Sequence, residues 1–385
     1  MTKTIQLSIS NAIISGLGLI STIIFQRYVI DEVYGSTLLV LGYASLIIST
    51  IDIGNDAKFL GEKRKDKWDN SQVSFLVIRC LLLVLTLLLI QKFIAFESEE
   101  YVLLVLLSIS GFLSRLLSFV YLFEHDIKLY FASLFLNVSI KILCLYFIVI
   151  EKQEIIMLLL CLFLVSILYK IIISLSILKA LRFEFKPEHR KWDLWYILYG
   201  ILLVIIVRAE VLMLPYGYSE FEYAVLLSLT NLAMALPIVI TNSIFLIGLV
   251  SRNESSPLHK NVKFVVVVIL AVVILSFGSA SILKLLYGQE WAIYANLLRL
   301  LLFAFVGGIV FANLEPYFIK YKMRQVIAAR SIQASIHLVL LFLLIFLELP
   351  LVFVGLAIVM NRVFIWLYYT ISYEKKTVQS IDKSI

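Results

Sequence analysis

The residues of this sequence that could do chemistry are charged side chains inside apolar segments. Between Leu194 and Tyr218, an apolar run long enough to cross a bilayer carries Arg208 and Glu210. A charge at membrane depth costs about 2.5 to 3.5 kcal/mol on insertion scales, so it persists only where it faces protein, a partner or a water-filled cavity. On a regular helix these two side chains diverge by about 200°, so we expect one of them to pair with another helix.

Basic residues outnumber acidic residues among the embedded charges. Because so many cations cannot all find a carboxylate, the surplus predicts a cavity built for an anion. The embedded basic residues are Arg79, Arg115, Lys141, Lys170, Arg208, Arg299, Arg330 and Arg362, and the embedded acids are Asp52, Glu210 and Glu315.

The predicted depth of each cation separates their roles. Arg299 and Arg330 lie near predicted helix ends, from which a long side chain can snorkel to the interface. Arg115 lies one to two turns deeper on the cytoplasmic side, where snorkelling and a cavity role are both open. Lys141 and Arg362 lie near mid-membrane, too deep for easy snorkelling, and we predict that they line the cavity.

The embedded acids have several possible roles. Asp52 could be a helix-end acid, a partner for an arginine, or a proton or sodium site. Asp52 and Glu210 are therefore the candidates for ion coupling or for balancing the embedded positive charge.

The sequence shows no catalytic or metal-binding constellation. The four histidines are scattered, mostly at predicted inner loops, and none has a spaced acid or nucleophile. The three cysteines lie inside apolar runs without paired or metal-type spacing, and no phosphate-binding loop is found. We predict no disulfide, no metal, no cofactor and no enzyme activity.

The composition identifies the elements that must position these charges. The 385 residues are 62% hydrophobic and 15% charged, whereas soluble domains are about 45 to 50% apolar. The chain is therefore predicted to be an all-α integral membrane protein with about 12 transmembrane helices. The predicted spans are residues 5–25, 37–53, 73–90, 101–123, 129–150, 155–178, 194–214, 223–250, 264–283, 295–319, 326–346 and 351–373.

The basic residues outside the spans decide the orientation, because short cytoplasmic loops retain lysine and arginine. The predicted outer loops hold only Arg27, Lys92, Lys152 and Lys284. Both termini are thus predicted to be cytoplasmic. The net charge of +7 follows this topology and does not indicate nucleic acid.

A basic linker at residues 179–193 divides the chain into residues 1–178 and 194–385, each with six predicted spans. Loops are short on both faces, which argues against membrane glycosyltransferases and polymerases that need a large outer loop. Gly307, Gly308 and Pro316 in the tenth span predict either a bent helix or close helix packing.

Three stretches resemble one family when taken in order. They are residues 16–54, with a Tyr-Gly loop and a second helix ending in an acid and glycine; residues 206–237, with Arg208 and Glu210; and residues 282–302, with a second Tyr-Gly loop. They are similar to the O-antigen flippases of Wzx type, in the multidrug/oligosaccharidyl-lipid/polysaccharide exporter superfamily. Glu210 stands where that family typically has an aspartate.

The resemblance implies two six-helix bundles around a central cavity, in the bacterial inner membrane. It implies transport of an oligosaccharide on undecaprenyl diphosphate from the cytoplasmic to the periplasmic leaflet, with a polymerase and a chain-length regulator as partners. Arginine and lysine bind diphosphate well. The alternatives are another exporter of the superfamily, for lipid II or for drugs and ions, and then a membrane glycosyltransferase or O-antigen polymerase. The residues assigned to the substrate are Arg27, Arg115, Lys141, Arg208 and Arg362.

Overall fold

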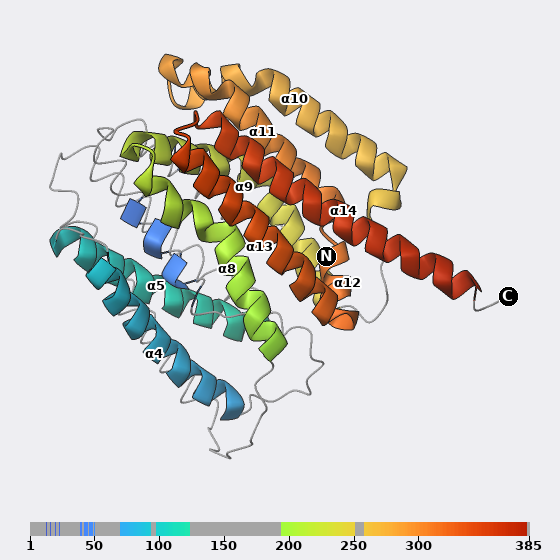
Figure 1. The fold of residues 1–385 in the computed structure, drawn as a ribbon, viewed down its shortest axis with the longest axis horizontal. Coiled ribbons are helices and arrows are strands. Elements are labelled where there is room, and N and C mark those ends of the chain that lie inside the picture. Colours follow the sequence, from blue (N-terminus) through green and yellow to red (C-terminus); the bar gives the residue numbers. More distant parts are fainter. Residues whose placement is uncertain are drawn as a thin grey trace. The chain divides into compact units, whose positions relative to one another are not determined.

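A computed structural model gives the fold of the chain (Figure 1). It describes residues 70–93, 98–123, 194–250 and 258–382, and scattered residues between Ile13 and Thr50. Within these ranges every regular element is a helix. Helices α4 (Asn70–Phe93) and α5 (Ser98–Phe123) belong to one compact unit, and the helices from Trp195 onward form a second unit.

The second unit holds the longest continuous part of the described chain. Among the fully described residues of this unit, the stretches long and apolar enough to cross a membrane are Leu194–Tyr216, Val262–Leu286, Gln289–Phe311, Met323–Phe346 and Val352–Glu374. Its elements are α8 (Leu194–Met213), η1 (Leu214–Tyr216), α9 (Glu220–Val250), η2 (Leu258–Lys260), α10 (Val262–Leu286), η3 (Gln289–Tyr294), α11 (Ala295–Val306), η4 (Gly307–Phe311), α12 (Leu314–Tyr321), α13 (Met323–Phe346) and α14 (Val352–Asp382).

The predicted spans from residue 73 to 123 and from residue 194 onward are helical to within a few residues at each end. The predicted spans 129–150 and 155–178 lie outside the described residues, as does the linker at 179–193. The domain boundaries drawn from the sequence therefore remain predictions.

Helix α11 is the centre of the second unit. It packs against α9, α10 and α14, and Leu297, Leu298 and Leu301 on it are at most 2% exposed. Helix α10 packs mainly on α11 and η3, and its outer side chains stay exposed, Phe277 to 84%. A helix that is apolar all round and exposed on one face is stable beside lipid tails.

The tenth predicted span is not one helix, because η4 separates α11 from α12. Gly307 and Gly308, at this break, have no side chain, which leaves room for the ring of Trp366 from α14. A Cβ on Gly308 would lie 3.1 Å from Trp366, and Trp366 stacks on Phe311 with ring centroids 5.2 Å apart. The break starts a new helix at Leu314, which places Glu315 in its first turn.

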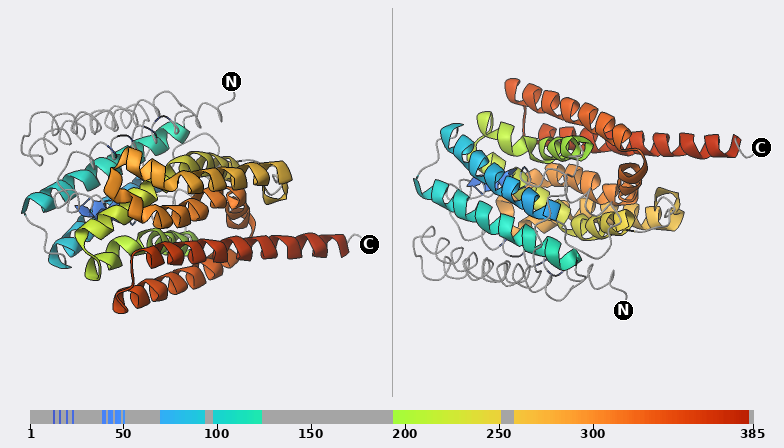
Figure 2. Two further views of the ribbon diagram at one scale, coloured as in Figure 1. Left: turned by 90° about the horizontal axis from the view of Figure 1, so that it is seen from above. Right: turned by 90° about the horizontal axis from the view of Figure 1, so that it is seen from below.

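The two ends of the second unit carry opposite charges. Successive helices run in alternating directions (Figure 1), so the turns after α8, α10 and α13 share one end, and the turns after α9 and α12 share the other. The first, acidic end holds Glu220, Glu222, Glu290 and Glu348 with Lys284, and the second, basic end holds Lys260, Lys263, Lys322 and Arg324. Figure 2 shows α14 continuing beyond its neighbours to the C-terminus. A cytoplasmic basic end is what retention of lysine and arginine predicts.

Candidate functional site

A row of polar side chains runs along one face of α13. Arg330, Gln333 and His337 are three and four residues apart, a spacing that places side chains on the same face of a helix. Their exposed fractions are 5%, 0% and 1%. Because the rest of this face is apolar, each of the three polar groups needs a partner from a neighbouring helix.

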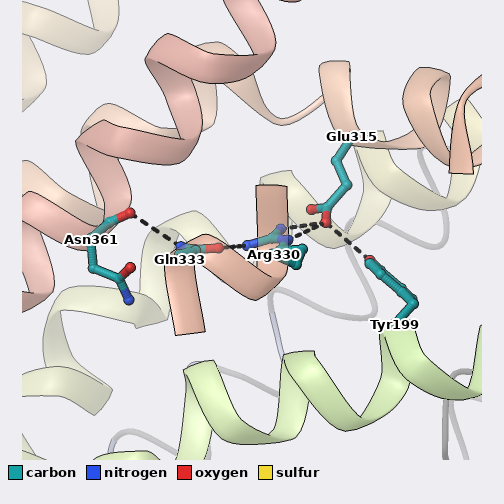
Figure 3. A network of polar contacts seen from close by, with 5 residues as sticks. All are labelled: Tyr199, Glu315, Arg330, Gln333 and Asn361. Atoms are coloured by element: carbon teal, nitrogen blue, oxygen red, sulfur yellow. Dashed lines mark hydrogen bonds and ion pairs between the residues drawn. The ribbon is translucent and has the colours of Figure 1, made fainter. Parts of the chain in front are cut away.

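Arg330 forms an ion pair with Glu315 of α12 (Figure 3). The Nε of Arg330 donates to the Oε1 of Glu315 at 3.0 Å, and its Nη2 donates to the same oxygen. The hydroxyl of Tyr199, on α8, also donates to that oxygen at 3.1 Å. The arginine side chain is 6% exposed and the glutamate side chain 19%, so the pair is largely shielded from solvent.

The same arginine extends the network to α14. Its Nη1 donates to the Oε1 of Gln333 at 2.6 Å, and the Nε2 of Gln333 donates to the backbone oxygen of Asn361 at 3.1 Å. Figure 3 shows these side chains in line. Polar contacts therefore join α8, α12, α13 and α14 within the apolar interior of the unit.

An aromatic stack supports the arginine. The guanidinium of Arg330 lies 6.0 Å from the ring centroid of Tyr369, and Tyr369 stacks on Phe318 at 4.9 Å. Asn361, Ile365 and Tyr369 follow each other at intervals of four along α14, and all three are buried. One face of α14 thus supplies both the ring and the backbone acceptor.

A second polar contact lies about 10 Å further along α13, at His337. The Nε2 of His337 lies 2.9 Å from the Oε1 of Glu210 on α8, and the glutamate side chain is 15% exposed. The Nδ1 of His337 is buried and makes no hydrogen bond to any residue that the structure describes. Buried polar atoms of this kind usually bond to protein or to an ordered water, so this nitrogen is a place for a further polar group.

Comparison with solved structures identifies proteins that share the fold of this chain. No protein-family model matches the sequence, and no curated protein matches it. Among solved structures, the lipid II flippase MurJ in an inward closed conformation is 16% identical, with a TM-score of 0.63 over 96% of this chain and 87% of that chain. A MATE protein in complex with MaL6 is 11% identical, with a TM-score of 0.58 over 99% of this chain and 97% of that chain. The chain shares the fold of these two proteins. The predicted all-α membrane fold of about 12 helices is confirmed.

The structure places two of the predicted substrate residues beside the polar network. Arg208 lies on α8, two residues before Glu210, and is half-buried. Arg362 lies on α14 next to Asn361, with its guanidinium 5.2 Å from the ring centroid of Phe305. Arg362 also interacts electrostatically with Arg330, Glu210 and Glu315.

The structure does not test the position of the other predicted site residues relative to this network. Arg27, Asp52 and Lys141 lie outside the described residues. Arg115 lies in α5, which belongs to the other unit.

One sequence interpretation is corrected by the structure. Arg330 was expected to snorkel from a helix end, but its guanidinium is buried and paired with Glu315. The contact between His337, buried within α13, and Glu210 was not predicted from the sequence. The expectation that Arg208 or Glu210 pairs with another helix is confirmed for Glu210. The signal for the network was present in the sequence as polar residues spaced three and four apart in the apolar eleventh span.

Proposed function

We propose that this protein is a flippase for an oligosaccharide linked to undecaprenyl diphosphate, moving it from the cytoplasmic to the periplasmic leaflet of the bacterial inner membrane. The likeness to a lipid II flippase along 96% of the chain carries the proposal. A polymerase and a chain-length regulator that use the exported glycan would be its partners.

The charges of the second unit support an anionic substrate. Arg330 is neutralised by Glu315, whereas Arg362 forms no ion pair with any residue that the structure describes. A half-buried guanidinium without an ion-pair partner is costly in a membrane, and a diphosphate would offset that cost through paired N–H to oxygen hydrogen bonds. We assign Arg362 and Arg208 to the diphosphate, together with Arg27, Arg115 and Lys141.

The embedded acids have a different role in this proposal. Glu210 contacts a histidine and Glu315 contacts an arginine, so neither carboxylate is offered alone to a ligand. Glu210 and Asp52 would offset the fixed positive charge, or hold a coupling ion, while the empty transporter resets.

The second candidate is an exporter of cationic drugs. The likeness to a MATE protein over 97% of that protein's chain favours it. A cationic drug would need accessible carboxylates, and both embedded acids of the second unit are already in contact with basic side chains. The charge arrangement therefore supports the anionic substrate better.

The proposal is tested with purified protein in liposomes that hold a fluorescent oligosaccharide on undecaprenyl diphosphate. Flipping is followed by the exposure of the sugar to an impermeant oxidising reagent. Loss of a charged hydrogen-bonding partner is worth about 1.5 to 3 kcal/mol, so Arg362→Ala should slow the initial rate at least about tenfold. Arg362→Lys should keep part of the rate, because it keeps the charge but not the paired geometry.

Arg299→Ala is the matched control. Arg299 is exposed and donates to neutral groups, the backbone oxygen of Ser276 at 3.1 Å and the Oδ1 of Asn296 at 2.8 Å. This variant should flip within about twofold of the wild type, as expected for an exposed position. A wild-type rate for Arg362→Ala would reject the assignment of this residue, and transport of cationic drugs without any flipping of the glycan lipid would reject the function.

A further inference from the structure

An open cavity lies at the acidic end of the second unit, where α8 passes into α9 and α13 passes into α14. Its volume is about 640 Å³, within the range of about 300 to 1,000 Å³ typical of small-molecule sites. We call it the end cavity, and the residues that line it are Pro215, Tyr216, Gly217, Tyr218, Glu222, Ile345, Glu348, Leu349 and Pro350.

The walls of the end cavity are fixed to each other. The hydroxyl of Tyr218 donates to the backbone oxygen of Leu349 at 2.7 Å, which ties one loop to the other. Burial and the charge of Glu222 raise the pKa of Tyr218, so this hydroxyl stays protonated and keeps donating at neutral pH. Gly217 allows the close approach, because a Cβ there would lie 2.5 Å from a methyl carbon of Ile345. A preformed cavity reduces the entropy lost on binding a ligand.

One wall offers an aromatic ring. The side chain of Tyr216 is 78% exposed, while Tyr218 beside it is held by its hydrogen bond. A tyrosine ring presents a flat apolar face with a polar edge, and such a face suits the C–H face of a sugar.

Two carboxylates supply hydrogen-bond acceptors. The Oε2 of Glu222 accepts from the backbone N–H and the hydroxyl of Ser219, both at 3.0 Å. Its Oε1 accepts no hydrogen bond from the described residues. Each carboxylate oxygen can accept two hydrogen bonds, so acceptor capacity remains for a ligand.

The backbone at Glu348 has a conformation that a glutamate rarely adopts. Its φ is +50°, in the left-handed region that costs a residue with a Cβ about 1 to 2 kcal/mol and that glycine enters freely. This conformation commonly ends a helix, and here the N–H of Leu349 closes the turn by donating to the backbone oxygen of Leu344 at 3.0 Å. Glycine is the usual residue there, so a glutamate at this place adds a carboxylate to the lining of the end cavity at a conformational cost.

We propose that the end cavity binds carbohydrate, with Tyr216 stacking on a sugar ring and Glu222 and Glu348 accepting its hydroxyl hydrogens. Two carboxylates repel acidic sugars, so the ligand is a neutral or amino sugar. A metal ion fits less well, because no three His, Cys, Asp or Glu side chains of the described chain gather closely enough to hold one. The cavity would hold the glycan as it leaves the transporter, a role that rests on the proposed function.

The test is saturation-transfer NMR on the full-length protein in nanodiscs. The probes are neutral trisaccharides of glucose, galactose, mannose, rhamnose and N-acetylglucosamine, with trigalacturonic acid as the acidic comparison. At least one neutral probe should bind, and trigalacturonic acid should not. Losing a stacked ring costs about 1 kcal/mol, so Tyr216→Ala should weaken binding at least about fivefold.

Two variants separate binding from folding. Glu348→Gly removes the carboxylate while suiting the left-handed backbone, so it should abolish binding and leave thermal stability equal or higher. Tyr321→Ala is the control, because it removes a 54% exposed tyrosine from the opposite end of the unit, and it should bind like the wild type.

The outcomes also separate this proposal from the proposed function. If none of the neutral probes binds, if both cavity variants bind like the wild type, or if only Ca²⁺ or spermine binds, the carbohydrate site is rejected. If the protein binds sugar but flips no glycan lipid, the carbohydrate site is supported and the flippase function is rejected. If it flips the glycan lipid but binds no sugar, the flippase function is supported and the carbohydrate site is rejected.

Discussion

Replacing Glu315 with glutamine would leave the buried guanidinium of Arg330 without its countercharge. The carboxylate oxygen of Glu315 accepts from two nitrogens of Arg330 and from the hydroxyl of Tyr199. Glutamine keeps an oxygen in nearly the same place and can still accept these bonds. The substitution therefore removes the charge and leaves the shape.

The size of the effect follows from the burial of the pair. Breaking a buried ion pair costs about 3 to 5 kcal/mol in soluble proteins, and an arginine at the centre of a membrane helix costs about 2.5 to 3.5 kcal/mol. Arg330 would keep its bond to Gln333 and the face of Tyr369. We therefore expect Glu315→Gln to lower the free energy of unfolding by about 2 to 3 kcal/mol.

The assay is unfolding by sodium dodecyl sulfate in mixed micelles, followed by circular dichroism. The double variant Glu315→Gln with Arg330→Met removes both charges, so it should recover to within about 1 kcal/mol of the wild type. Glu290→Gln, at an exposed acid of η3, is the control and should change stability by less than about 0.5 kcal/mol. A Glu315→Gln protein as stable as the wild type, or a double variant less stable than the single one, would refute the reasoning.

Two further predictions concern sidedness and driving force. In a cysteine-free background, Tyr216→Cys should react with an impermeant thiol reagent on intact cells, and Tyr321→Cys should react only after permeabilisation. The two positions lie at opposite ends of the second unit. Labelling of Tyr321→Cys on intact cells would reverse the predicted topology. The free energy of a diphosphate with roughly two negative charges falls by about 4.6 kcal/mol per 100 mV when it moves out of a cell that is negative inside. Vesicles with an imposed potential and no proton or sodium gradient should therefore still flip the lipid-linked glycan. Flipping that stops under a held potential would show instead that Asp52 or Glu210 couples transport to an ion.

The positions of the helices could be predicted because a helix that spans a membrane hydrogen-bonds its own backbone polar groups and needs about 20 apolar residues. Their ends were harder to place, and this explains the error at Arg330. The apolar run begins at Val326, but the polar residues before it continue the helix from Met323. Arg330 therefore lies two turns inside α13, beyond the reach of easy snorkelling.

The partners of the embedded charges could be predicted only in part. The cost of embedded charges predicted that Arg208 or Glu210 pairs with another helix, but hydropathy treats each helix alone. The partner of Glu210, His337, is 127 residues away, and the two meet because packing sets the rotation of α8 against α13. Gly307 and Gly308 predicted either a bent tenth span or close helix packing, but the ring of Trp366 that lies against both glycines comes from another helix.

The hydrogen bonds from Tyr199 through Arg330 to Asn361 also have a mechanical consequence. They cross four helices, so sliding any one of these helices by a turn, about 5.4 Å, would separate bonded groups. Each separation would strand polar atoms where no bulk water can replace the lost partner, at several kcal/mol per group. Helices α8, α12, α13 and α14 therefore resist internal shear, and a larger motion of this unit would tilt them together as one block.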